Sequence, residues 1–231
     1  MARPHPQLEI LYLDNHLLAV NKPACLPTMG APSGQPSLHS LARQYIRRRF
    51  HKRGNVYLGV VSRLDAVASG VVIFARTSKA AARLSEQFRS RSVEKVYWAI
   101  VEGHISRESG TMVDWLVKDE ARQCMRVTKR GTGAQEARLS YCCLESVPIG
   151  TLVEISLETG RKHQIRVQFA KRGHPILGDR KYGSQADFPG AIALLARKLV
   201  LKHPTTGAMI AVVAPLPRIW RRLGVHVPES D

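Results

Sequence analysis

The chain has 231 residues, of which 44% are apolar, so it can bury a hydrophobic core without disulfides or structural metal ions. Its 35 Lys and Arg residues outnumber its 18 Asp and Glu residues, and self-repulsion at a net charge of +17 indicates an anionic partner. Because Met1–Gln7 shows no signal peptide and no apolar run approaches about 20 residues, nucleic acid is favoured over a membrane as that partner.

Cysteine usage indicates the cytoplasm. Cys25, Cys124, Cys142 and Cys143 show no Cys-x-x-Cys spacing. The last two are adjacent in a strand-like run, so their side chains should point to opposite faces. We therefore expect four reduced thiols and no structural zinc site.

The first quarter of the chain predicts a hairpin, a loop and a helix. Strands over Leu8–Tyr12 and Leu17–Val20 flank a polar turn. The segment Pro27–Pro36 is rich in Pro, Gly and Ser, which is typical of a loop. Ser37 is a suitable N-cap for a helix whose apolar residues recur at helical spacing as far as Ile46.

A run of cations follows that helix. It comprises Arg47, Arg48, Arg49, His51, Lys52 and Arg53. Cations at the C-terminal end of a helix interact favourably with the helix dipole, so the run has a purely structural explanation. At this net charge, contacts with phosphate groups explain the run equally well.

One carboxylate in the middle of the chain has an unusual setting. The apolar runs Val56–Val61 and Val71–Ala75 predict two buried strands, and Asp65 lies between them, beside Arg63 and before the turn pair Ser69-Gly70. Taken alone, such an Asp is usually a turn former. In a chain poor in acids, a carboxylate held in an accessible loop by rigid strands also suits a functional site.

The remaining elements indicate the fold class. Further strands are expected over Lys95–Ile105, Ala137–Leu144, Leu152–Leu157, Leu194–Leu201 and Met209–Val213. Helices are expected from Ser78, as N-cap, to about Arg91 and over Pro217–Leu223. The segment Lys118–Thr132 carries five basic residues and predicts an exposed hairpin or loop. This order favours an α+β fold with a mainly antiparallel, mixed sheet flanked by helices and loops.

A second informative stretch predicts a helix over Thr159–Gly173, with Thr159 as its cap and Gly173 as its end. Ile165 and Phe169 lie four residues apart and should face inward.

Lys162 and Arg166 should share another face of this helix near its start. Cations in a first helical turn oppose the dipole, so their presence suggests that they act on an anion. His163 has no second His or Cys at metal-ligand spacing. We therefore expect it to form a hydrogen bond or contact RNA.

Six motifs in order carry a resemblance to the RluA family of pseudouridine synthases, over about residues 8–217. They are Leu18-Ala19-Val20-Asn21-Lys22-Pro23, Ser62-Arg63-Leu64-Asp65 with Ser69-Gly70, Glu94-Lys95-Val96-Tyr97, Thr159-Gly160-Arg161-Lys162-His163-Gln164-Ile165-Arg166, His174-Pro175-Ile176-Leu177-Gly178-Asp179 and Leu201-Lys202-His203-Pro204.

The resemblance implies one catalytic domain with a central active-site cleft, extending over residues 1–231 and lacking the S4-type RNA-binding module. It implies conversion of a uridine in RNA into pseudouridine without a metal or organic cofactor. Asp65 would act as nucleophile or charge stabiliser. Arg166 would be its ion-pair partner, and Tyr97 would pack on the target base and assist proton removal.

The resemblance also assigns the RNA contacts. A stacked uracil must be flipped out to reach a carboxylate, and Arg63 would fill the vacated position. Its plain alternative is a salt bridge to an exposed acid. Phosphates would be held by Arg161, Lys162 and the Arg47–Arg53 cluster, and His163 would contact RNA.

Two positions depart from the family pattern, which has His where this chain has Ser62 and Thr where it has Ala68. These departures leave an RNA-binding or assembly factor without activity as one alternative. A hydrolase of N-glycosidic bonds is a second. A basic DNA-binding module is disfavoured, because no helix-turn-helix or zinc-finger pattern is present. We expect a monomer acting on a stem-loop of tRNA or rRNA.

Overall fold

The computed structural model describes residues 8–32, 34–189 and 191–226 and divides the chain into two compact units. The first unit extends to Val93 and includes Val200–Ala214, and the second comprises Glu94–Leu199 and the C-terminal residues from Pro215. The stretch Met1–Gln7, predicted to carry no signal peptide, lies outside the described residues. No helix in the described part of the chain is long and apolar enough to span a membrane.

The first unit is built on an antiparallel sheet. Its strands are β1 (Glu9–Leu13), β2 (Leu17–Lys22), β3 (Gly59–Val60), β4 (Ser69–Ala75) and β11 (Met209–Val213). Strand β2 pairs with β1 on one side and with β4 on the other, and β3 pairs with the end of β4. The predicted hairpin at the N-terminus is confirmed. The predicted strand over Val56–Val61 is wrong except for β3.

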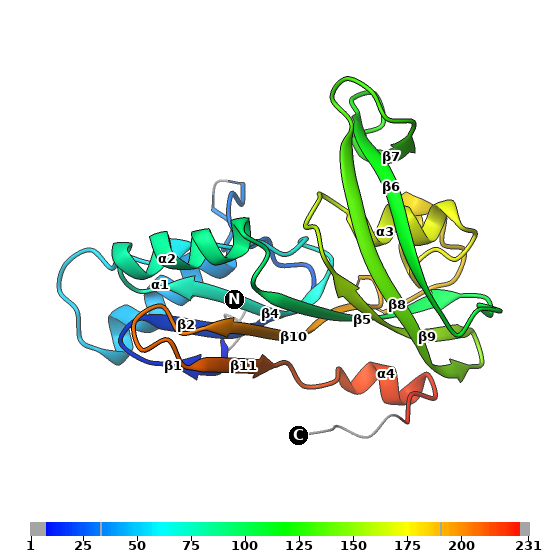
Figure 1. Ribbon diagram of the computed structural model, residues 1–231. Helices are drawn as coiled ribbons and strands as arrows, with labels where there is room; N and C mark the ends of the chain where they lie inside the picture. The colour runs from blue at the N-terminus through cyan, green and yellow to red at the C-terminus, as the bar shows by residue number, and fades with distance from the viewer. Residues whose placement is uncertain (1–7, 33, 190, 227–231) are drawn as a thin grey trace. The chain divides into compact units, whose positions relative to one another are not determined.

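Two helices accompany this sheet, α1 (Leu38–Arg49) and α2 (Ser78–Arg89), and α2 lies alongside β4 (Figure 1). Ser37 caps α1 as predicted, with its side chain and that of Ser40 forming a capping box. The cap of α2 is Thr77, one residue before the predicted Ser78. The apolar stripe of α1 packs on one face of β2 and β4, in a core that contains Leu18, Val20, Leu38, Leu41, Ile46, Val72 and Phe74.

The second unit is an antiparallel sheet with the order β5-β9-β8-β6-β7. Its strands are β5 (Glu94–Glu102), β6 (Ser109–Asp119), β7 (Cys124–Thr128), β8 (Gln135–Val147) and β9 (Gly150–Leu157). The long strands β6 and β8 run side by side, with β7 at one end of them (Figure 1). The predicted hairpin over Lys118–Thr132 is confirmed as the β6–β7 turn. Strand β6 itself was not predicted.

Three short helical elements and a shared strand complete the fold. They are α3 (Gln164–Lys171), η1 (Arg180–Tyr182), α4 (Arg218–Arg222) and β10 (Leu194–Lys202), whose residues divide between the two units. Helix α3 packs beside β6 and β7 over a small core that includes Leu116, Ala137 and Val167. The predicted α+β class with a mainly antiparallel sheet is confirmed.

Candidate active site

Asp65 lies half-buried in the loop between β3 and β4, as predicted. The turn itself is formed by Ala66 and Val67, because the Ala68 N–H donates to the Asp65 carbonyl over 3.1 Å. The predicted turn pair Ser69-Gly70 instead begins β4, where Gly70 has a φ of +114°. Only glycine adopts that backbone angle without strain, so Gly70 sets the direction in which the chain leaves the Asp65 loop.

Lys22, at the end of β2, holds this loop from beneath. Its side chain is fully buried, and its Nζ donates to the carbonyls of Pro23, Leu26 and Ala66 at 2.9, 2.8 and 2.9 Å. Three acceptors match the three donors of an ammonium group. Lys22 also pairs in the sheet with Gly70, so it contacts both the Asp65 loop, at Ala66, and the start of β4 that follows the loop.

Burial lowers the pKa of Lys22 from 10.5 to about 8, although the negative charge of nearby Asp65 and the Cys25 thiol oppose this shift. The Lys22 ammonium therefore lies close enough to the Asp65 carboxylate for the two charges to attract each other.

Thr28 forms hydrogen bonds with the loop on the N-terminal side of Asp65. Its hydroxyl donates to the Leu64 carbonyl at 2.9 Å and accepts from the Leu64 N–H at 3.2 Å. The side chain is 3% exposed, so these two bonds form away from solvent. Because the Thr28 carbonyl also accepts from His39 N in α1, the residue links helix and loop. The backbone on both sides of Asp65 is thereby fixed.

Arg63 and the two departures from the family pattern occupy the same loop. Arg63 is exposed and forms no ion pair with any residue that the structure describes, so the plain salt-bridge explanation is unsupported. Ser62 is half-buried. Ala68 is fully buried, so the extra atoms of a Thr would require the surrounding side chains to shift.

Arg166, in α3, is buried in the second unit and pairs with Asp179. Its Nε donates to Oδ2 at 2.7 Å and its Nη2 to Oδ1 at 2.9 Å, and both side chains are at most 6% exposed. The guanidinium also lies 5.0 Å from the centre of the Tyr182 ring. A bidentate fork uses two of the five N–H donors and fixes the plane of the group. The predicted pairing of Arg166 with Asp65 stays a prediction.

The segment before α3 differs from the prediction. The helix begins at Gln164 and not near Thr159, so Lys162 precedes the helix and does not share a helical face with Arg166. The Thr159 hydroxyl donates instead to the Gln164 side chain at 2.7 Å. The inward positions of Ile165 and Phe169 are confirmed, since both are at most 4% exposed.

His163 is the N-cap residue of α3 and adopts a left-handed backbone, with φ of 53°. This conformation is uncommon for a residue with a side chain. Its Nδ1 lies 2.8 Å from the Tyr182 hydroxyl, which also accepts from Met125 N at 2.9 Å. Burial raises the pKa of Tyr182 to about 12, so the phenol keeps its proton at neutral pH. The predicted hydrogen-bonding role of His163 is confirmed.

The other predicted site residues lie nearby in the sequence and on β5. Lys162 is exposed, whereas Arg161 is half-buried and its Nε donates to the Glu136 carbonyl at 2.9 Å. Tyr97 is half-buried in β5 and pairs in the sheet with Ile155 of β9. Their contacts with RNA stay predictions.

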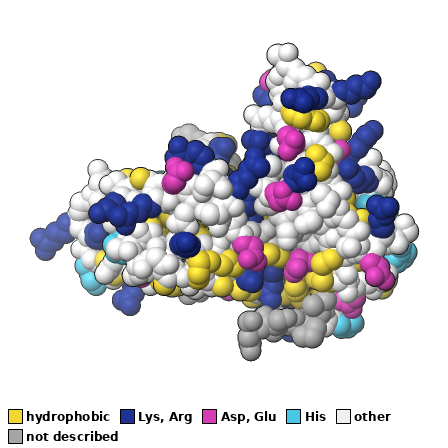
Figure 2. All heavy atoms as spheres, in the orientation of Figure 1, with side chains coloured by type: hydrophobic (Ala, Val, Ile, Leu, Met, Phe, Trp, Pro, Cys, Tyr) yellow, Lys and Arg dark blue, Asp and Glu magenta, His cyan; other side chains and the backbone are white. Residues whose placement is uncertain are grey.

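Basic surfaces occur on both units. In the second, the β6–β7 hairpin and its surroundings expose Lys118, Arg122, Arg126, Lys129, Arg130 and Lys162. Figure 2 shows Lys and Arg side chains gathered over this hairpin. In the first, the cluster from Arg47 to Arg53 is exposed at the end of α1. Within the described residues, no group of three or more His, Cys, Asp or Glu side chains could hold a metal ion.

Four supporting residues were not predicted to have these roles: Lys22, Thr28, Asp179 and Tyr182. Lys22 and Asp179 belong to the quoted motifs, so the motifs contained a signal that the residue pattern alone did not explain. Thr28 carries no comparable sign, because it lies in a loop rich in Pro, Gly and Ser.

The comparisons with known proteins identify the family of the chain. Residues 16–171 match the family described as RNA pseudouridylate synthase. The chain is 34% identical over 210 residues to the dual-specificity RNA pseudouridine synthase RluA of Haemophilus influenzae, covering 87% of this chain and 90% of the relative. It is 36% identical over 227 residues to ribosomal large subunit pseudouridine synthase D of Xylella fastidiosa, covering 91% and 66%.

A solved structure shows the same architecture. The structure titled human RNA pseudouridylate synthase domain containing 4 superposes with a TM-score of 0.80 at 27% identity, and the match covers 96% of this chain and 95% of that one. The similarity therefore extends over both compact units.

Proposed function

This chain belongs to the RNA pseudouridylate synthase family, and we propose that it isomerises a specific uridine in a stem-loop of tRNA or rRNA. The family assignment makes the protein an isomerase that acts on RNA. We further propose that the two units act together as one catalytic domain over about residues 8–217, as a monomer in the cytoplasm. The observation that carries the proposal is Asp65, held in a loop whose backbone is fixed on both sides.

The proposed reaction leaves the atomic composition of the uridine unchanged. The bond from N1 of uracil to the sugar carbon breaks, the base rotates, and a bond from C5 to the same carbon forms. The proton on C5 leaves and N1 gains a proton. Asp65 stabilises or captures the detached sugar or base during the rotation, and this step requires its ionised carboxylate.

Charge near Asp65 supports this role. The buried ammonium of Lys22 lies close to the Asp65 carboxylate within the first unit, and the attraction between the two charges opposes the fall in the Lys22 pKa on burial. Arg166 is proposed as the second cation beside Asp65, because it matches the ion-pair partner in the family motif. Asp179 would then act as a positioning residue, because its bidentate bond fixes the plane of the Arg166 guanidinium.

Tyr97 and Arg63 are proposed to handle the base. A uracil within stacked RNA must leave the stack to meet Asp65, and unstacking costs a few kcal/mol. Arg63 is exposed beside Asp65 and has no ion pair among the described residues, so it can occupy the vacated position. Tyr97 is proposed to pack on the flipped base and to assist removal of the C5 proton.

Phosphate contacts are proposed for Arg161, Lys162 and His163. Lys162 is the most accessible of the three, while Arg161 and His163 already bond the protein through one ring or guanidinium nitrogen each. Such contacts hold the RNA in position, carry little sequence information and weaken steeply with salt.

The choice between tRNA and rRNA rests on the relatives. The Haemophilus influenzae relative is named as dual-specificity and the Xylella fastidiosa relative as acting on the ribosomal large subunit. These names support rRNA and more than one target RNA, and tRNA is included in the proposal on the expectation of a compact stem-loop.

The test uses RNA that carries tritium at C5 of uracil. Isomerisation releases this tritium to water, whereas binding or base excision leaves it on the ring. Bulk tRNA and unmodified rRNA are incubated separately with wild type, Asp65→Asn and Glu86→Gln. Glu86→Gln is the matched control, because it removes one exposed carboxylate of the same unit.

Release from one RNA pool by wild type and Glu86→Gln, but not by Asp65→Asn, supports the reaction, the nucleophile and the substrate class together. No release from either pool, with RNA still bound, would instead support a factor that binds without catalysis. Free uracil among the products would indicate a hydrolase.

A further inference from the structure

Side chains of α1 form hydrogen bonds with the backbone of residues 54–58, which follow that helix in the chain. His39 Nε2 donates to the Leu58 carbonyl at 2.8 Å, Arg43 Nε to the Val56 carbonyl at 3.1 Å, and Arg47 Nη2 to the Gly54 carbonyl at 3.5 Å. The three donors are four residues apart and so form one stripe on the helix. The three acceptor carbonyls belong to every second residue of the segment, which runs antiparallel to α1.

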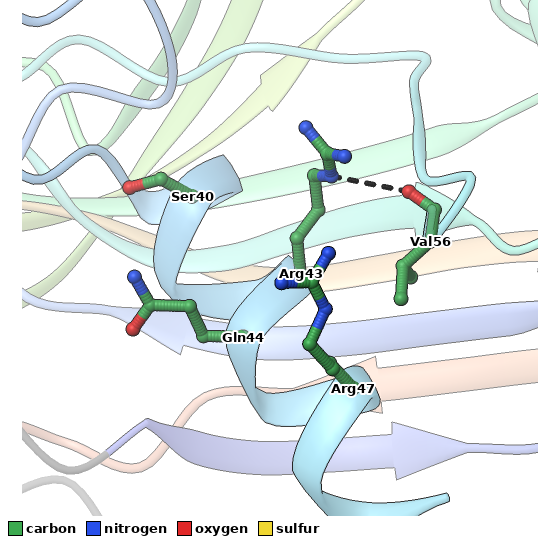
Figure 3. A pocket seen from close by; sticks show the side chains of 5 residues that line it. All are labelled: Ser40, Arg43, Gln44, Arg47 and Val56. Atoms are coloured by element: carbon green, nitrogen blue, oxygen red, sulfur yellow. Dashed lines mark hydrogen bonds between the residues drawn. The ribbon is translucent and has the colours of Figure 1, made fainter. Parts of the chain in front are cut away.

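A hollow of about 220 Å³ lies on this stripe, lined by Ser40, Arg43, Gln44, Arg47 and Val56 (Figure 3). Figure 3 shows both arginines extending from α1 toward the segment that contains Val56. The Nε bond to Val56 fixes the Arg43 guanidinium, and the two terminal nitrogens of that group point away from the carbonyl. The lining therefore presents fixed donors.

The charge of the hollow is unbalanced. Arg43 and Arg47 are like charges at helical spacing of four, which is mildly unfavourable. The lining contains no acid, and neither arginine forms an ion pair with a residue in the described ranges. The C-terminal end of α1 offsets part of the Arg47 charge, because the helix dipole is negative there. An anion bound between the Arg43 and Arg47 guanidinium groups would neutralise the remaining positive charge.

The size of the hollow and the donors that line it suit a phosphate group. Guanidinium groups bind phosphate with paired N–H donors, and the Gln44 amide adds further donors. Pockets that bury a whole small-molecule ligand are typically about 300–1,000 Å³, so this hollow suits a single phosphate group.

We propose that this hollow is a phosphate-binding subsite, separate from Asp65, that takes a backbone phosphate of the substrate RNA. The assignment of the anion to RNA rests on the proposed function. Val56 precedes Asp65 by nine residues, so at most about 32 Å of chain separates hollow from nucleophile. One RNA stem-loop can occupy both.

The test compares two double variants with equal charge. Arg43→Gln with Arg47→Gln removes the hollow's cations, and Lys79→Gln with Arg89→Gln removes two exposed cations of α2. RNA affinity is measured at several salt concentrations, with the pool that releases tritium or, if neither does, with bulk tRNA. The binding result therefore stands even if the proposed reaction fails.

The hollow variant should weaken RNA binding by about threefold to tenfold at moderate salt, the range of a partly exposed charge-assisted contact. The slope of log affinity against log salt should fall in magnitude by about 0.7–0.9, as for the loss of one phosphate contact. Equal affinities and slopes for the two double variants would overturn the proposal.

Two further arms complete the test. Arg47→Gln alone keeps the Arg43 bond to Val56, so it reports on phosphate binding if the double variant unfolds; Arg89→Gln is its control. Inorganic phosphate is also titrated while the melting temperature is followed. A phosphate-dependent stabilisation that the hollow variant loses, together with an unchanged RNA slope, would assign the hollow to free phosphate and overturn the RNA assignment.

Discussion

The Asp65 loop and the start of α3 both hold predicted catalytic residues, but they are built differently. The loop is fixed through its backbone, by Lys22 bonding the Ala66 carbonyl and Thr28 bonding Leu64. The start of α3 is fixed through its functional side chains. Arg166 is paired with buried Asp179, and His163 is bonded to Tyr182.

This difference separates the effects of mutation. In the loop, the residues that hold the structure are not the residues predicted to react, so activity and stability can change independently. At the start of α3, one side chain serves the fold and the predicted chemistry, so both should be lost together. Each prediction below tests one side of this contrast.

The largest effect is expected from Arg166→Met. The substitution leaves the Asp179 carboxylate buried without its cation, since both side chains are at most 6% exposed. Breaking a buried pair in this way should lower the free energy of unfolding by about 3–5 kcal/mol. Chemical denaturation measures the loss, and tritium release should fall with it.

Arg172→Met is the matched control. It removes another Arg–Asp pair of α3 and its neighbours, but Arg172 is 35% exposed and its partner Asp114 is 13% exposed. We expect a loss of about 1 kcal/mol or less for this more solvated pair. Equal losses for the two variants would show that Arg166 contributes no more to the fold than a surface cation.

Lys22 should give pH effects of opposite sign on stability and activity. Its pKa is about 8 in the folded protein against 10.5 when exposed, because burial disfavours the charge. Between these values the unfolded chain binds more protons than the folded protein, so stability rises with pH there, by up to about 3 kcal/mol in total. Activity should fall over the same range, because a neutral Lys22 amine has two N–H donors for three carbonyls and so holds the Asp65 loop less firmly.

The measurement is the difference in unfolding free energy between wild type and Lys22→Met from pH 7 to pH 10.5. Tyrosine titration is common to both proteins and cancels in the difference. A flat difference would mean that Lys22 keeps its proton in the folded state throughout. The variant should also lose stability at every pH, because three carbonyls lose their donor.

The sequence predicted those features that local pattern determines. The strands β2 and β4, the Ser37 cap and the position of Asp65 between strands follow from apolar runs and capping chemistry. The strand predicted over Val56–Val61 failed for a physical reason. Its carbonyls at Val56 and Leu58 accept from Arg43 and His39 of α1, so they are not available to a sheet.

The supporting residues of the site depend on contacts that are distant in sequence. Lys22 bonds Ala66 across 44 positions and Thr28 bonds Leu64 across 36. No periodicity encodes such a pairing. For the same reason, the buried partner of Arg166 was not predicted, although Asp179 lies in a quoted motif. Strand β6 was missed because its polar residues Thr111, Asp114 and Lys118 stand three and four positions apart, so no period of two is visible in its sequence.

Among the three substitutions of site residues, the smallest effect on stability is expected from Thr28→Val, which keeps the shape of the side chain and removes its hydroxyl. Two bonds to the Leu64 backbone are lost, at a cost of about 1–2 kcal/mol. Because the loop then holds Asp65 less firmly, the single-turnover rate should fall about tenfold while RNA affinity is unchanged.

Thr151→Val supplies the matched control in the second unit. Its hydroxyl is equally buried, donates to the Gly103 carbonyl and accepts from Ile105 N, and supports a turn that holds no predicted site residue. The two variants should lose similar stability, but only Thr28→Val should lose rate. If both variants kept the wild-type rate, the backbone bonds around Asp65 would serve the fold alone. In the loop, activity would then depend on the Asp65 side chain alone and not on the bonds that fix its backbone.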